Sequence, residues 1–167
     1  MTWFNSVRVY SPSASPLTFA TRNNMDLNCT EFIQALGNLQ PADDDCSLES
    51  TLYDLVETIE KSEDPTPVFP YIFKFIEKYP EAEFGSPGAL VHFAEQYPVY
   101  EQFLFESLRI KPTYLTLWML NRILNAEPEG SRRDELMALL KNSITHPEAG
   151  SLAKSEADDF YQFQNEK

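Results

Sequence analysis

The chain has 167 residues, of which 43% are hydrophobic and 13% aromatic, and this composition excludes an intrinsically disordered protein. One globular domain of this length can bury a core without help from disulfides or a structural metal. The formal net charge of −13 excludes nucleic acid and anionic membranes as partners, because both would be repelled, and it favours a cationic protein.

Residues 1–25 differ from the rest of the chain in charge and in pattern. They contain Arg8 and Arg22 and no acidic residue, so the remaining chain carries 11 of the 13 basic residues and all 26 acidic ones. We predict an extended or short-strand N-terminal arm here, with a linker-like run at 11–16. An alternative is that the natural protein begins at Met25 and that the preceding residues come from a vector or a misassigned start. Residues 26–167 are predicted to form a single α-helical domain.

The hydrophobic pattern after residue 25 predicts an all-α fold of about eight helices, with almost no strand signal. Apolar residues recur at the i, i+3, i+4 spacing that places them on one face of a helix. The expected helices span 27–39, 47–59, 67–78, 87–97, 99–110, 113–125, 131–146 and 151–164. Thr66, Ser86 and Ser131 stand at expected helix starts. Each is expected to cap its helix, because a short side-chain oxygen accepts a free N–H of the first turn. For the third helix, Phe69 is an alternative start, because Pro70 fits only near the first turn.

The segment at 113–125 is the most apolar of the chain and has two adjoining apolar faces, so we expect this helix to lie between neighbours. The last helix has sparse apolar positions at Leu152, Phe160 and Phe163. Short connectors predict that sequential helices are antiparallel neighbours. Helix starts marked by proline recur about every twenty to twenty-five residues, which suggests stacked helical pairs of the HEAT or armadillo kind. An irregular compact bundle remains the alternative.

No residue pattern predicts catalytic chemistry, a metal site or a cofactor. His92 and Glu95 have the spacing of half a metal site, but no second pair matches them, so His92 is predicted to be structural. Cys29 and Cys46 lack the spacing of a redox or metal motif and are expected to be reduced thiols. Asn121 and Arg122 interrupt the apolar central helix and are predicted, with His92, to form a structural polar core. Arg122 could pair with Glu95 or Glu106.

No apolar run is long enough to cross a membrane, and polar residues occupy the N-terminus where a signal peptide would need an apolar run. The cytoplasm is therefore the expected location.

Acidic residues mixed with aromatic ones are the remaining functional signal. Tyrosine offers rigid contact area at protein interfaces, so acidic residues with tyrosines nearby favour a protein-binding surface. The alternative is a solvated face that keeps the protein soluble. The predicted partner-binding residues are Asp43, Asp44, Asp45, Glu81, Glu83, Phe84, Tyr97, Tyr100, Glu127 and Glu129.

Two short segments carry a resemblance, Gly85-Ser-Pro-Gly-Ala-Leu-Val-His92 and Thr116-Leu-Trp-Met-Leu-Asn-Arg122. Together with the order of the helices, they resemble small all-helical, HEAT-like immunity proteins of bacterial polymorphic-toxin and contact-dependent growth inhibition systems. The similarity extends from about Ser47 to Thr145. It implies a non-enzymatic protein that binds and blocks a cognate toxin domain, and an acidic inhibitor suits a nuclease toxin with a basic cleft. The alternatives are a helical scaffold for another basic partner and an enzyme that uses His92.

Overall fold

The computed structural model describes residues 26–41 and 46–166, and within these ranges the chain is entirely helices and connectors, with no strand. The arm at 1–25 and the acidic run Asp43, Asp44 and Asp45 lie outside the described residues. The predicted all-α class and number of helices are confirmed. The helices are α1 Leu27–Asn38, α2 Cys46–Ile59, α3 Phe69–Lys78, α4 Ala89–Glu95, α5 Tyr100–Ile110, α6 Tyr114–Ala126, α7 Ser131–Ile144 and α8 Ser151–Asn165.

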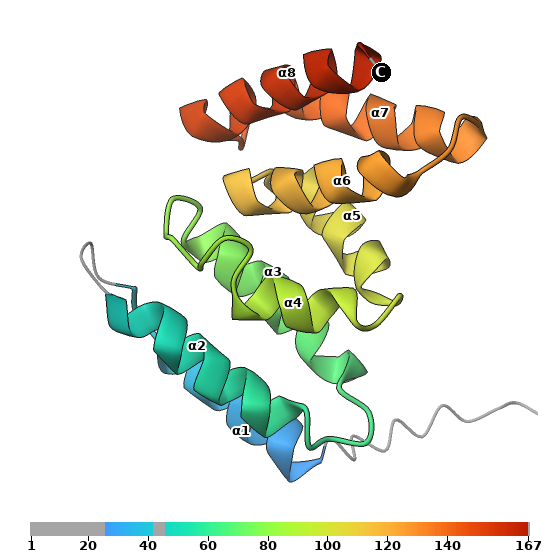
Figure 1. Ribbon diagram of the computed structural model, residues 1–167. Coiled ribbons are helices and arrows are strands. Elements are labelled where there is room, and N and C mark those ends of the chain that lie inside the picture. The colour runs from blue at the N-terminus through green and yellow to red at the C-terminus, as the bar shows by residue number, and fades with distance from the viewer. Residues whose placement is uncertain (1–25, 42–45, 167) are drawn as a thin grey trace, which may run out of the picture.

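The helices form a stack of two rows that progresses in chain order, from α1 and α2 at one end to α7 and α8 at the other (Figure 1). In one row, which we call the odd row, α1 packs on α3, α3 on α5 and α5 on α7. In the other, the even row, α2 packs on α4 and α6 packs on α8. Except between α4 and α6, contacts between successive members of each row agree with the predicted stack of helix pairs, in which each pair buries its apolar face on its neighbours.

Helix α6 occupies the central position that its sequence predicts. It packs against α5, α7 and α8, and seven of its residues are buried. In the first half of the stack, the core is aromatic around Phe69. The Phe69 ring stacks on Phe93 at 5.8 Å and on Phe103 at 5.9 Å between centroids. These rings join α3 to α4 and α5 in the same apolar cluster that continues through α6 to α8.

Three predicted helix caps are wrong. Thr66 begins a short 3-10 turn, Thr66–Val68, so α3 starts at Phe69, which was the alternative start. Helix α4 starts at Ala89 behind Gly88, three residues after Ser86. Ser131 is the first residue inside α7, and Gly130 before it makes no side-chain cap.

The side-chain caps that form lie elsewhere. Asp26 accepts a hydrogen bond from the backbone N–H of Cys29 at 2.8 Å, at the start of α1. Thr113 and Thr116 form a reciprocal capping box at the start of α6.

Of the three apolar positions predicted for α8, only Phe160 packs against the core. Leu152 and Phe163 are 46% and 47% exposed, whereas Ala153, Ala157 and Gln164 are buried. Helix α8 packs on both α6 and α7, and small alanine side chains allow helices to approach closely on that side. Gln164 is accepted there because its amide is fully hydrogen-bonded to neighbouring helices.

Candidate functional site

Helix α2 and the residue that follows it carry an acidic surface, which we define by Glu49, Asp54, Glu57 and Glu60. All four side chains are exposed, because Leu48, Leu52, Val56 and Ile59 turn the apolar stripe of the helix into the core. The helix itself contains no basic residue. The nearest cation in sequence, Lys61, lies 3.4 Å from Glu57, and both side chains are well exposed, so this pair screens the surface only weakly.

A groove between α2 and α4 borders this acidic surface, and we call it the α2–α4 groove. It encloses about 320 Å³ and is lined on one side by Asp54, Glu57 and Glu60. From α4, His92 and Gln96 line the other side, and the Gln96 amide donates to the Glu60 carboxylate at 3.3 Å. The exposed ring of Tyr53 also lines the groove. Three carboxylates, two polar side chains and an aromatic ring therefore converge between two helices.

A second hollow, the α4–α6 cleft, has about 520 Å³ and is lined by residues of α4, α5 and α6 and the connector between α4 and α5. Its charges are paired. The Arg122 guanidinium binds Glu95 through two hydrogen bonds of 2.6 and 2.8 Å. Glu101, another lining residue, accepts from Arg132 at 2.6 Å. Because each of these carboxylates has a guanidinium partner, this cleft lacks the excess of negative charge that the α2–α4 groove has.

Two of the three predicted aromatic contacts are buried in the core. Phe84 is only 3% exposed and packs on Phe75 with 5.5 Å between ring centroids. Tyr100 is 6% exposed, at the start of α5. Tyr97 is half-buried, with its ring against Phe93 at 5.3 Å. The prediction that Phe84 and Tyr100 contact a partner is therefore wrong, because the core needs these rings to fill the space between helices.

The environment of Tyr100 leads to a testable pH dependence. Burial, followed by the nearby carboxylates of Glu95 and Glu101, raises the pKa of Tyr100 to about 12. The unfolded chain keeps a pKa near 10, so between pH 10 and 12 the unfolded state has lost this proton and the folded state has not. The free energy of unfolding should then fall with rising pH, by up to about 1.4 kcal/mol per pH unit from this group. Urea unfolding of wild type and Tyr100→Phe at pH 9, 10 and 11 measures the difference, and parallel pH profiles would contradict it.

The predicted acidic contacts are dispersed. Glu81 and Glu83 are exposed on the connector between α3 and α4. Glu127 lies 3.0 Å from Arg132, and Glu129, although exposed, lies 3.3 Å from Arg133. None of these four lines the α2–α4 groove. The acidic residues that do line it follow from the helical pattern of 48–59, which places Asp54 and Glu57 off the apolar stripe.

The predicted structural polar core is partly wrong. His92 is exposed in the α2–α4 groove. Arg122 forms the predicted ion pair with Glu95, but its side chain is 42% exposed, so the pair lies at the surface. Asn121 is half-buried and accepts a hydrogen bond of 2.6 Å from Gln164, in keeping with a structural role.

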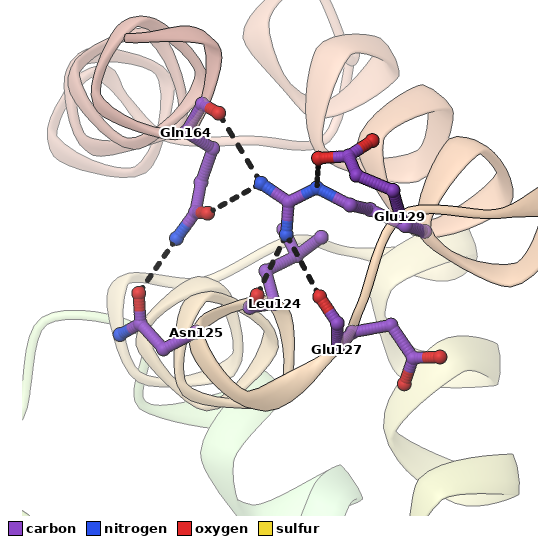
Figure 2. Close-up of polar contacts among 6 residues, drawn as sticks. Leu124, Asn125, Glu127, Glu129 and Gln164 are labelled. Carbon is purple, nitrogen blue, oxygen red and sulfur yellow. Dashed lines mark hydrogen bonds and ion pairs between the residues drawn. The ribbon is translucent and has the colours of Figure 1, made fainter. Parts of the chain in front are cut away.

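The buried polar centre of the molecule is Arg133, which the sequence interpretation missed. Its guanidinium donates to the backbone carbonyls of Leu124 and Glu127 at 2.7 and 3.3 Å (Figure 2). It also donates to the backbone carbonyl and side-chain oxygen of Gln164 at 3.2 and 3.0 Å. Arg133 stands three residues before Leu136 and seven before Leu140 on the buried stripe of α7, and this spacing is a signal that could have placed it inside.

The remaining chemistry of the described residues is sparse. Within residues 26–41 and 46–166, no group of three histidine, cysteine or carboxylate side chains could hold a metal ion. Burial raises the pKa of the Cys29 thiol, which makes a reactive thiolate unfavourable. None of the described helices has the length and apolar character needed to cross a membrane. Comparison of the chain with protein-family models, with curated proteins and with solved structures finds no match in any of the three.

Proposed function

We propose that this protein is a non-catalytic binding protein whose acidic surface on α2 and adjoining α2–α4 groove take a cationic protein partner. The observation that carries the proposal is the convergence of Asp54, Glu57 and Glu60 in one groove with no lysine or arginine lining it. Such a concentration of one charge steers an oppositely charged partner and accelerates its association. His92 and Gln96 on the opposite side supply directional hydrogen bonds, and the exposed ring of Tyr53 supplies contact area.

More specifically, we propose that the partner is a bacterial toxin domain and that the protein is its immunity protein, which blocks the toxin by covering its active site. The support is the resemblance of Gly85–His92 and Thr116–Arg122 to immunity proteins, together with the net charge of −13. A nuclease toxin fits best, because its substrate cleft must be basic. The two-row stack of helices suits equally a scaffold that binds another basic protein, so this is the second candidate.

The test is first whether a toxin domain is encoded beside this gene, and then whether the protein binds that domain, with association rates measured by surface plasmon resonance. We expect Asp54→Asn, Glu57→Gln and Glu60→Gln combined to slow association by about tenfold, because the steering charge is lost. Raising the salt concentration tenfold should lower the association rate of the wild-type protein by a similar factor, because salt screens exposed charges.

A matched control removes the same number of charges from the odd row, by Glu31→Gln, Glu106→Gln and Glu135→Gln, all at exposed positions. The control should change the association rate less than threefold, because none of these carboxylates lines the α2–α4 groove. Equal effects of the two triple variants would refute the α2–α4 groove as the binding surface. Binding to a different basic protein, without protection of cells against the toxin, would favour the scaffold. A His92→Ala variant that loses protection while it still binds would favour an enzyme.

A further inference from the structure

The junction between the first four helices and the last four is held differently on its two sides. In the odd row, α3 packs directly on α5. Phe69 stacks on Phe103 there, and the Ser107 hydroxyl donates to the Glu77 carboxylate at 2.6 Å. Phe69 is fully buried and Ser107 is 2% exposed. The α3–α5 side is thus an apolar interface with a short hydrogen bond. Helices α3 and α5 stay in contact as long as the rings of Phe69 and Phe103 remain stacked.

In the even row, no pair of helices packs closely across the same junction. Helix α4 packs on α2, and α6 packs on α5, α7 and α8, but α4 and α6 do not pack closely on each other. Between them lies the α4–α6 cleft of about 520 Å³. The ion pair of Glu95 on α4 with Arg122 on α6 spans it, and the guanidinium also lies over the Trp118 ring, 5.1 Å from its centroid. At the surface, this side is therefore held by an exposed ion pair, above buried side chains of α4 and α6.

We propose that α1–α4 and α5–α8 move as two bodies about the α3–α5 interface, and that the Glu95–Arg122 ion pair is the latch that holds the α4–α6 cleft closed. Among the described residues, α3 and α5 are the only helices that pack closely across the junction, so rotation about this contact leaves the packing within each half intact. Opening widens the cleft and lengthens the even row. An exposed ion pair contributes little free energy, even with two hydrogen bonds, so the closed state is favoured only modestly by it.

The latch differs from the other ion pairs of the described residues because its two residues come from different halves. Arg132 forms a comparable pair with Glu101, but both belong to the second half, and its side chains are 53% and 29% exposed against 42% and 23% for the latch. Breaking the Arg132 pair should therefore loosen α5 against α7 without opening the cleft. Arg122→Met and Arg132→Met are matched variants, since each removes one guanidinium from an exposed pair and keeps a long apolar side chain.

The experiment measures the length of the even row in the full chain. Spin labels on Ser50→Cys in α2 and Ser155→Cys in α8, both exposed, are attached in a Cys46→Ser background, and their distance distribution is recorded by pulsed electron resonance. We expect Arg122→Met to increase the population at longer distance by about three- to fivefold. Arg132→Met should leave the distribution unchanged. Exchanging the charges, by Glu95→Arg with Arg122→Glu, should restore the short distance.

A second label pair confined to the last four helices, on Glu135→Cys and Ser155→Cys, distinguishes hinge motion from general loosening. Its distance distribution should be the same in wild type and in Arg122→Met. The proposal is overturned if Arg122→Met leaves the Ser50–Ser155 distances unchanged, if Arg132→Met changes them as much, or if the second pair broadens to the same extent. The result does not depend on which partner the α2–α4 groove binds.

Discussion

Replacing Arg133 by methionine is expected to lower the free energy of unfolding by about 3 kcal/mol or more, because it leaves several buried acceptors without a donor. The carbonyls of Leu124 and Gln164 and the side-chain oxygen of Gln164 all accept from this guanidinium in buried surroundings. Each buried acceptor that loses its partner costs about 1–3 kcal/mol. These bonds join the end of α6, the start of α7 and the end of α8, so the loss should concentrate in the last three helices.

Arg132, the residue before Arg133, provides the control for this prediction. Arg132→Met removes the same group from an exposed position, where ion pairs contribute at most about 1 kcal/mol, so it should change stability little. Arg133→Lys should recover only part of the loss, because an ammonium cannot reach all the acceptors that the planar guanidinium satisfies. Urea unfolding measures the free energy of unfolding of each variant, and hydrogen exchange shows whether the loss of stability is concentrated in α8. A loss under 1 kcal/mol for Arg133→Met would show that water replaces the guanidinium at these carbonyls.

Gly88→Ala is expected to destabilise the protein by at least about 2 kcal/mol, through backbone strain and a steric clash. Gly88 has a φ of +80°, in the left-handed region that side chains disfavour. A Cβ atom at this position would lie 1.8 Å from the backbone oxygen of Phe84. Phe84 is itself buried, so the connector cannot move away without displacing its ring from the core.

Gly37→Ala is the matched control, because it makes the same chemical change where nothing opposes it. Gly37 lies within α1 and a Cβ there would meet no atom within 4 Å. Alanine favours a helix over glycine by about 1 kcal/mol, so this variant should be slightly stabilised. Thermal unfolding followed by circular dichroism distinguishes the two variants by the sign of the change. If Gly88→Ala unfolds at the wild-type temperature, the tight turn before α4 is not required by the fold.

The Gly88 result also bears on the resemblance to immunity proteins. Gly85 and Gly88 both have positive φ and approach each other closely, with 2.7 Å between a Cβ built on Gly85 and the Cα of Gly88. The first segment of the resemblance therefore begins with a tight turn, which leads into α4. The proposed toxin binding is tested at the α2–α4 groove and not at this turn.

The helices could be predicted because their signals are local. The predicted spans 99–110 and 113–125 compare with Tyr100–Ile110 and Tyr114–Ala126 in the structure. Apolar spacing within one segment and proline at its edges decide these bounds, and no distant residue is needed. Predicted caps at Ser86 and Ser131 were wrong because glycine turns of positive φ set the chain direction just before α4 and α7.

The candidate site was harder to predict, because a groove requires residues from two helices in a particular relative position. The pattern of α2 placed Asp54 and Glu57 on its exposed face, but nothing local showed that His92 and Gln96 of α4 would face them. Likewise, aromatic character suggested Phe84 and Tyr100 as surface contacts, whereas the packing of neighbouring helices buries both. Burial of a particular ring depends on which helix covers it, which sequence spacing does not contain.

By itself, then, the amino-acid sequence determined the all-α class, the positions of the helices and the negative charge, since each depends on local spacing or composition. Tertiary structure alone decided that Asp54, Glu57 and Glu60 share a groove with His92, and that Arg133 is the buried polar centre. It also decided that Glu95 and not Glu106 pairs with Arg122. The physical reason is that the register between helices is set by how their side chains interlock, and this involves residues far apart in the chain.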